Sequence, residues 1–307
     1  MDKKRFLGKW LIKISILLIL IGSRSFFQEL LISALSAHGE VELESKNNYY
    51  LTYTYSYIKN VDNFEPQNKT DLLNLYYTVI NSGVDEFSFY CPKEYKKCLD
   101  DVVELAENQN ELSDINGFVH PFNSFDTIET TYDSLRKVQL KIVKTYTDKE
   151  IEEINKKVDE IIKNVVKEEK DTKKVIQLIH DYIIEHTKYD KDRADFNKVN
   201  YASNTAYGVL FEGYGVCNGY ADAMSIFLNR YNIPNYKIAS ANHIWNAVNL
   251  DGKWYHLDLT WDDPITKDNK DVILHDYFLI TSNKLKTLDV TQHTFNMETY
   301  VEMKSED

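Results

Sequence analysis

The sequence predicts an α+β fold in which a helix packs on an antiparallel sheet, with a smaller α+β region before it. Three observations predict this class. Helical and alternating apolar spacings occur in the same chain. A helical pattern begins at Cys217. The pair Asp251-Gly252 joins two alternating runs, which is the strongest short-range signal of a β-hairpin. An apolar content of 43% across 307 residues is enough for more than one packed unit.

Residues 1–40 have the layout of an export signal. Basic residues at positions 3–13 precede an apolar run at 14–22, and Arg24 separates this run from a second apolar stretch at 26–37. The first run is shorter than the roughly 20 residues that a membrane-spanning helix needs. Small residues at 34–37 offer a cleavage site. We therefore expect an exported protein that is extracellular, at the cell surface, or anchored to the membrane by this segment. A cytoplasmic N-terminal helix is the alternative.

Residues 41–146 are expected to form an α+β domain. Alternating tyrosines predict a strand from 41 to about 57, whose aromatic face would pack in a core or, alternatively, contact sugar or peptide. A helix at 70–80, a strand at 85–91, a helix at 92–107 and a hairpin of 127–132 with 138–146 follow. No catalytic or ligand-binding motif is found in this region. The only function that its sequence suggests is docking on cell-wall material through the tyrosines.

The cysteines allow two exclusive expectations. Export would place all three in oxidising surroundings, where Cys91 and Cys98 would pair and leave Cys217 as the odd thiol. If Pro92 instead opens a helix that runs through Cys98, the two α-carbons lie about 10 Å apart, which is too far for a disulfide. A bridge therefore requires a turn after Cys91.

Residues 147–307 are expected to form a second domain. Thr147 and Glu150 predict a capping box before a long amphipathic helix, and Asp171 predicts the start of another. His180 and His186 lie on this second helix, six positions apart, so they do not share a face and make a poor metal pair. We interpret both as surface histidines or as histidines with satisfied hydrogen bonds.

The helical pattern after Gly215 places Cys217 at a helix N-terminus, with Asp222 expected in the first turn. Free N–H groups and the helix dipole favour an anion there, which in this case is a thiolate. Gly213 and Gly215 would let the chain turn sharply, and Gly219 would keep the first turn open to a substrate. A buried structural cysteine is the alternative, but it predicts apolar bulk where the sequence has glycines.

The two-residue turn at Asp251-Gly252 fixes the register of the hairpin, with Leu250 opposite Lys253. His243 and Asp258 then become diagonal neighbours about 7 Å apart, so the carboxylate would orient the imidazole and stabilise its charged form. One face of the hairpin is expected to carry His243, Trp245, His256, Asp258 and Thr260. The other, expected to face the core, carries Ile244, Val248, Tyr255, Leu257 and Leu259. Because His256 shares the face of His243, it is the rival candidate for a base.

Three motifs resemble the transglutaminase-like superfamily, whose core is papain-like. They are Gly-x-Cys-x-Gly-x-Ala at 215–221, His-x-Trp-Asn at 243–246 and Trp-x-x-x-Asp-x-Thr-Trp at 254–261, and the resemblance covers roughly 147–281. It implies Cys217 as nucleophile, His243 as base and Asp258 as the orienting acid. Since the superfamily includes cross-linking enzymes, deamidases, peptidases and inactive forms, we expect a cysteine-dependent acyl transfer on protein or peptide amides, with a peptidase, an amidase or a surface binding module as alternatives.

Tyr189, Tyr207 and Trp245 are candidates for contacts with the substrate or with an oxyanion, and a place in the core is the alternative for each. The acidic residues at 190–195 and 262–263 lack a calcium-loop pattern, so we expect no metal and no cofactor. A net charge of -12 without a basic stripe argues against a nucleic-acid partner. The oligomeric state is not predicted by any pattern.

Overall fold

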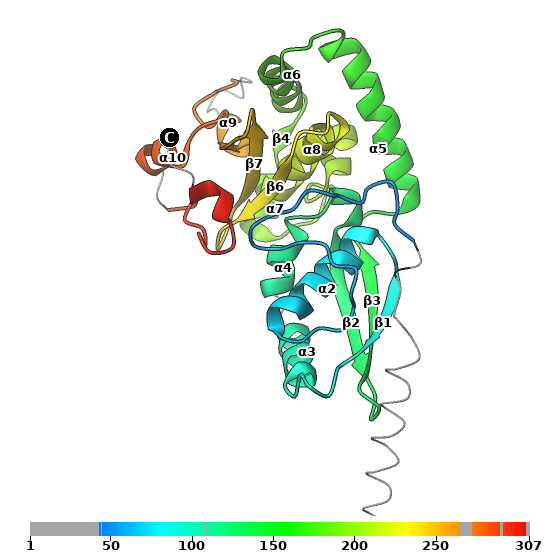
Figure 1. Ribbon diagram of the computed structural model, residues 1–307. Helices are drawn as coiled ribbons and strands as arrows, with labels where there is room; N and C mark the ends of the chain where they lie inside the picture. Colours follow the sequence, from blue (N-terminus) through cyan, green and yellow to red (C-terminus); the bar gives the residue numbers. More distant parts are fainter. Residues whose placement is uncertain (1–42, 44, 109, 265–271, 289–290, 305–307) are drawn as a thin grey trace, which may run out of the picture.

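The computed structural model describes residues 43, 45–108, 110–264, 272–288 and 291–304. The predicted export signal at residues 1–40 lies outside them. Within the described residues, no helix combines the length and the apolar character that crossing a membrane requires. Helices and strands are mixed along the described chain, so the predicted α+β class is confirmed (Figure 1).

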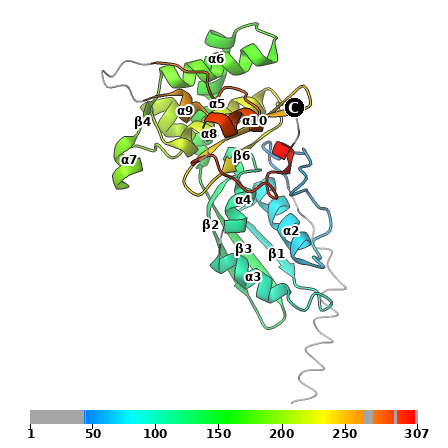
Figure 2. The same cartoon turned by 90° about the vertical axis from the view of Figure 1, so that its left-hand side faces the viewer.

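The first half is built on a three-stranded antiparallel sheet in the order β1-β3-β2, with helices α2, α3 and α4 gathered on one side of it (Figures 1 and 2). The predicted hairpin is confirmed as β2 and β3, joined at Asp133. The elements are α2 (Lys69–Ser82), β1 (Glu86–Tyr90), α3 (Cys98–Glu107), α4 (Asn110–Asn116), a short 3-10 helix (Pro121–Asn123), β2 (Phe125–Tyr132) and β3 (Lys137–Lys144).

The strand expected from residue 41 to about 57 is wrong. Residues 45–68 join no sheet among the described residues, and side chains of α2 bond the backbone of this segment at Leu51, Lys59 and Val61. Asn81 accepts from the N–H of Leu51 at 3.0 Å and donates to its carbonyl at 2.8 Å, and Thr78 Oγ1 accepts from the N–H of Val61 at 2.9 Å. Tyr55 still buries its ring. The alternation of tyrosines therefore reflects the packing of an extended segment and not sheet pairing.

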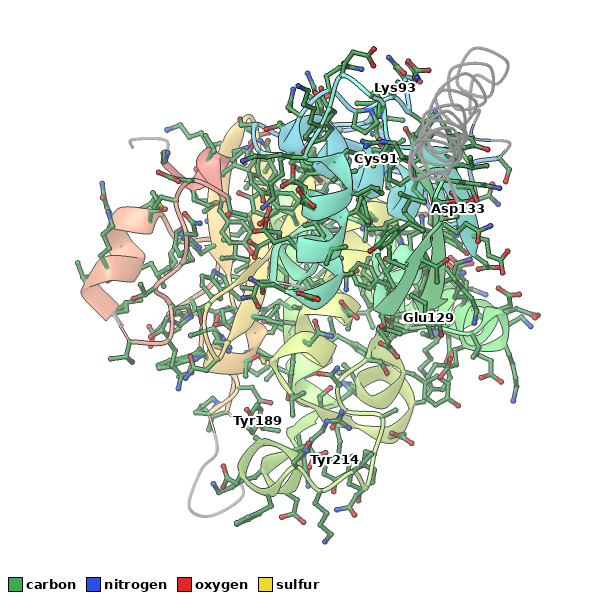
Figure 3. The ribbon with its side chains drawn as sticks, turned by 90° about the horizontal axis from the view of Figure 1, so that it is seen from below. Cys91, Lys93, Glu129, Asp133, Tyr189 and Tyr214 are labelled. Atoms are coloured by element: carbon green, nitrogen blue, oxygen red, sulfur yellow. A yellow bond between two sulfur atoms is a disulfide. The ribbon has the colours of Figure 1, made fainter. Side chains whose placement is uncertain are left out.

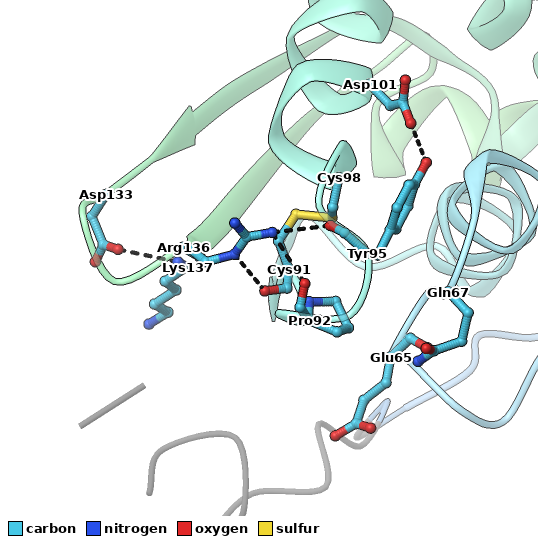
Figure 4. Close-up of a disulfide and its surroundings, with 10 residues drawn as sticks. All are labelled: Glu65, Gln67, Cys91, Pro92, Tyr95, Cys98, Asp101, Asp133, Arg136 and Lys137. Carbon is cyan, nitrogen blue, oxygen red and sulfur yellow. Dashed lines mark hydrogen bonds between the residues drawn. A yellow bond between two sulfur atoms is a disulfide. The ribbon is translucent and has the colours of Figure 1, made fainter. Parts of the chain in front are cut away.

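A disulfide joins Cys91, directly after β1, to Cys98, the first residue of α3, with their α-carbons 5.6 Å apart (Figure 4). The helix expected from Pro92 is wrong in its first turns, because the chain between the two cysteines forms a turn. The Arg136 guanidinium holds this turn by donating to the carbonyls of Cys91 at 2.9 Å and of Pro92 and Tyr95 at 3.1 Å each.

The second half places helices around a second three-stranded antiparallel sheet, in the order β6-β7-β8. The predicted helix starts are confirmed, since Thr147 and Glu150 form the capping box of α5 and Asp171 caps α6. The elements are α5 (Asp148–Ile161), a π-helical turn (Ile162–Val166), α6 (Thr172–Glu185), β4 (Lys188–Tyr189), α7 (Lys191–Phe196), a second π-helical turn (Gly208–Glu212), β5 (Tyr214–Gly215), α8 (Cys217–Arg230), β6 (Asn235–Ala239), β7 (Ile244–Leu250), β8 (Lys253–Leu257), α9 (Leu259–Asp262), α10 (Ser282–Leu288) and a 3-10 helix (Val301–Lys304).

The β7–β8 hairpin has the predicted register, with Leu250 opposite Lys253. Asp251 and Gly252 both have positive φ, as a type I′ turn requires. Strand pairing ends at Asn246 opposite Leu257. His243 and Asp258 therefore lie just beyond the paired residues, at the end of the hairpin away from its turn.

The face of this hairpin that was expected to face the core does so, and the opposite face is buried as well. On one face, Val248 and Leu257 join the hydrophobic core that includes α5, α6 and α8. On the other, Trp245 and Ala247 join the core of the first half. An aromatic cluster links the two halves there, with ring centroids 4.8 to 6.4 Å apart; it consists of Tyr55, Phe118, Tyr236, Trp254 and Tyr300.

Candidate active site

Cys217 is the first residue of α8, as predicted, and Val216 before it has extended backbone. Gly213, at φ 70°, lets the chain turn toward the helix. Cys217 is the free thiol among the three cysteines, and the residue as a whole is half-buried. Because N–H groups in the first turn of a helix lack carbonyl partners within it, this position favours a negative charge on the sulfur.

Gly219 serves packing and not substrate access, which corrects the expectation. A Cβ at this position would lie 2.3 Å from the carbonyl oxygen of Ser203 and 3.1 Å from that of Thr205. The first turn of α8 therefore lies directly against the backbone of residues 203–205. Asn218 adds a second contact there, since its Nδ2 donates to the carbonyl of Asn204 at 2.8 Å.

Asp222 lies in the second turn of α8 and not in the first, and it is fully buried. Its carboxylate pairs with Lys237 of β6, itself buried, and accepts from the Tyr146 hydroxyl at 2.7 Å. Lys237 also donates to Asn218 Oδ1 at 3.2 Å. This buried ion pair joins the second turn of α8 to the sheet, and the bond from Lys237 to Asn218 reaches the residue next to Cys217.

His243 lies directly before β7, and its side chain is 3% exposed. Its Nε2 lies 2.6 Å from Asp258 Oδ2, so Nδ1 is the ring nitrogen that remains for the Cys217 thiol. Burial lowers the pKa of His243, but the Asp258 carboxylate and a hydrogen bond with Cys217 outweigh it and raise that pKa to about 10. The imidazole is therefore protonated at neutral pH and presents a positive charge to the sulfur.

Asp258 is the N-cap residue of α9, and both of its carboxylate oxygens accept hydrogen bonds. Oδ1 accepts from the N–H groups of Thr260 at 2.9 Å and Trp261 at 3.2 Å, whereas Oδ2 faces His243. Burial raises the pKa of Asp258, but the neighbouring histidines hold it well below its usual range. The carboxylate is thus ionised and fixed in orientation.

His293 is a member of this cluster that the sequence did not reveal. Its Nε2 lies 2.8 Å from the same Asp258 Oδ2, and its side chain is fully buried. The ring stacks on Tyr277 and meets the edges of Trp245 and Trp261. His293 lies in an irregular segment 35 residues after Asp258, where no periodic pattern or motif would have marked it.

His256, the rival base, is committed to structural hydrogen bonds. Its Nδ1 accepts from the indole N–H of Trp245 at 2.9 Å, and its Nε2 contacts Ser282 Oγ at 3.0 Å. Burial lowers its pKa to about 3, so the ring is neutral. Trp245 is 1% exposed and stacks on His243 with ring centroids 5.6 Å apart. The indole therefore forms a wall behind the imidazole and does not face a substrate.

The two tyrosine candidates lie in different surroundings. Tyr189 of β4 is half-buried and pairs with Gly215, two residues before Cys217. Burial, and then the charge of Cys217, raise the pKa of Tyr189. Tyr189 and Tyr214 lie on the side of the molecule away from Cys91 (Figure 3). Tyr207 instead stacks on Phe211, 4.7 Å between centroids, and no described contact joins it to Cys217.

Two groups of described residues bring three potential metal ligands within 4.8 Å of one another: His243, Asp258 and His293, and His180, Asp181 and His275. In the first group, the ligand atoms are buried and bonded to each other beside the thiol. The second group lies outside this site.

Comparison with known proteins finds a recognised family in the second half of the chain. Residues 159–259 match the family described as Transglutaminase-like superfamily, and this range includes Cys217, His243 and Asp258. No curated protein matches the chain. The second half of the fold thus contains a transglutaminase-like core, and further α+β elements precede it.

Two solved structures are similar to parts of the chain. A TGase is 14% identical with a TM-score of 0.34, and the match covers 48% of this chain and 47% of that chain. A protein from Cytophaga hutchinsonii, described as a candidate cysteine protease, is 15% identical with a TM-score of 0.28, and the match covers 48% of this chain and 64% of that chain. The matched part spans less than two thirds of either protein.

Proposed function

We propose that this protein is a cysteine-dependent acyl-transfer enzyme acting on protein or peptide amides. The proposal starts from the transglutaminase-like superfamily domain at residues 159–259, which brings a cysteine, a histidine and an aspartate together. One observation carries the proposal. A single buried imidazole is hydrogen-bonded to a carboxylate through Nε2, and the free cysteine at a helix N-terminus lies close enough to the same ring to raise its pKa. This arrangement activates sulfur nucleophiles.

In the proposed reaction, Cys217 Sγ attacks the carbonyl carbon of a carboxamide or peptide bond. His243 Nδ1 gives its proton to the departing nitrogen, so the C–N bond breaks, ammonia or an amine leaves, and a thioester remains. A primary amine or water then attacks the thioester, His243 accepts its proton, and the thiolate is released. Asp258 stabilises the imidazolium throughout, and His293 holds the same carboxylate oxygen through a second hydrogen bond.

The oxyanion that forms during attack needs hydrogen-bond donors. The backbone N–H of Cys217, at the start of α8, is our first candidate. Tyr189 is the second, because it pairs with Gly215, two residues before Cys217, and burial with nearby negative charge keeps its hydroxyl protonated. We do not assign such a role to Tyr207 or Trp245, given the contacts that each makes.

Intact-mass analysis of glutamine-containing peptides, with and without a primary amine, tests the proposal and separates its variants. An amine adduct means transfer, a gain of about 1 Da means deamidation, and shorter peptides mean proteolysis, since each reports what resolves the thioester. Cys217→Ala should abolish every product while the circular dichroism spectrum stays that of the parent. If products persist in this variant, the mechanism is wrong. Unchanged peptides in every mixture would favour a non-catalytic binding module instead.

We also propose that the protein acts outside the cytoplasm, as an extracellular, cell-surface or membrane-associated enzyme. The Cys91–Cys98 disulfide supports this location, because such bonds persist in oxidising compartments. Fractionation of cells that express the full chain, combined with alkylation of free thiols, is the test. A cytoplasmic protein with reduced Cys91 would contradict it.

A further inference from the structure

A second histidine cluster lies on the far end of α9 from Asp258, and the proposed reaction does not use it. It joins His180 and Asp181 of α6 to His275, in the segment that follows α9. Asp181 Oδ1 lies 2.8 Å from His180 Nδ1 and 2.8 Å from His275 Nε2. One carboxylate oxygen and two ring nitrogens from distant parts of the chain thus converge on one point.

We propose that His180, Asp181 and His275 bind a divalent cation of the zinc class. The donor set is two imidazoles and one carboxylate, which suits zinc and disfavours calcium or magnesium. Donor atoms bound to zinc at about 2.0–2.1 Å in tetrahedral geometry lie about 3.3 Å apart. A widening of about 0.5 Å from the present contacts would admit the ion, and His275, with 40% of its side chain exposed, has room to move.

The surroundings of His180 match those of a metal-bound histidine. Its side chain is fully buried, and its second ring nitrogen, Nε2, lies 3.1 Å from Asp262 Oδ2. Metal-bound histidines commonly donate their other N–H to a carboxylate in this way, which fixes the ring and leaves one nitrogen for the metal. Asp262 is itself fixed, because its Oδ1 accepts from the N–H of Tyr277 at 3.0 Å.

The charge and the access also fit a cation. The carboxylates of Asp181 and Asp262 both contact the buried ring of His180. A divalent ion would neutralise these two negative charges. Asp181 and His275 are partly exposed, so the ion can enter from solvent and a water can complete the coordination. A bound ion would tie α6 to the segment that carries Tyr277, whose carbonyl accepts from the N–H of Asp258 at 3.2 Å.

Titration calorimetry of the full chain with Zn²⁺ alone tests the site, in a Cys217→Ser background that removes the thiol as a competing ligand. We expect one saturable site per chain and a rise in melting temperature with Zn²⁺. His275→Ala should remove both effects, and Asp262→Asn should weaken binding about 10- to 100-fold, as loss of an outer partner does. His186→Ala is the matched control, because this exposed histidine directly follows the same helix and lies outside the cluster, so the variant should bind as the parent does.

Two results would overturn the proposal. Absence of saturable Zn²⁺ binding in the Cys217→Ser chain would show that the cluster is a hydrogen-bonded network only. Binding that survives His275→Ala would place the ion elsewhere. Because the background variant lacks the nucleophile, failure of the metal site and failure of the proposed function are read from separate experiments.

Discussion

Replacing Asp258 with asparagine should remove the positive charge beside Cys217 while keeping the shape of the site. The introduced amide would still cap α9 through its oxygen. In the parent protein, the other carboxylate oxygen accepts hydrogen bonds from the ring nitrogens of His243 and His293. In the variant, an NH₂ group, which is a donor, would face these nitrogens instead. The pKa of His243 is about 10 in the folded protein against an ordinary value of 6.5, and this difference corresponds to about 5 kcal/mol in favour of the imidazolium. Without the carboxylate, burial dominates and the ring is neutral at pH 6.

The assay is the rate at which iodoacetamide labels Cys217 at pH 6, followed by intact mass. A charge pair about 4 Å apart at an effective dielectric of 20 is worth about 4 kcal/mol, so loss of the imidazolium should slow labelling between tenfold and about 1,000-fold. His243→Ala should have a similar effect, whereas Asp192→Asn, at an exposed carboxylate on α7, should label as the parent does. Asp258→Asn that remains folded and labels at the parental rate would refute the reasoning.

The same variant changes how stability depends on pH. The raised pKa of His243 contributes stability that is fully present below about pH 6.5 and is lost as pH rises toward about 10. Urea unfolding at pH 6, 8 and 10 should therefore show a steady decline in the free energy of unfolding. Adding Asp258→Asn should flatten that decline across this window, and an equal slope in both proteins would contradict the assigned pKa.

Other contacts in the structure give three more predictions. His293→Phe keeps the ring packing but removes a hydrogen bond to an ionised carboxylate. In steady-state kinetics, kcat should therefore fall about 10- to 100-fold at unchanged KM, and His293→Gln should restore it. Lys237→Met leaves the buried Asp222 charge unpaired, so urea unfolding should show a loss of about 3–5 kcal/mol, and Lys237→Met with Asp222→Leu should recover most of it. Replacing Cys91 and Cys98 by serine opens a short loop and should cost about 2.5 kcal/mol by chain entropy; a melting temperature equal to the parent's would contradict this.

The contact between His243 and Asp258 could be predicted from sequence because one local signal fixes it. Asp251-Gly252 demands a two-residue turn, the turn sets the register, and the register brings the two side chains together. His293 and His275 could not be predicted in the same way. Both lie in irregular segments, where the position of a side chain depends on tertiary packing and not on periodicity.

The errors have a similar physical origin. The alternating tyrosines at 49–57 have the spacing of a strand, but Asn81 of α2 bonds the backbone of Leu51 among them, where a neighbouring strand would pair. The helix expected from Pro92 begins only at Cys98, because the disulfide between Cys91 and Cys98 requires a turn between them. Gly219 was assigned to substrate access because a sequence does not show the carbonyl of Ser203 that lies against it.

The aromatic cluster between the two halves limits how the protein can be divided. A truncated chain that begins at residue 147 would lose Tyr55 and Phe118 and expose the rings of Tyr236, Trp254 and Tyr300 to water. Such a fragment would carry every residue of the proposed triad and yet be prone to aggregate through that apolar surface. The segment that precedes residue 147 therefore covers an apolar surface of the second half and should keep it soluble. Recombinant protein made for activity assays should include this segment.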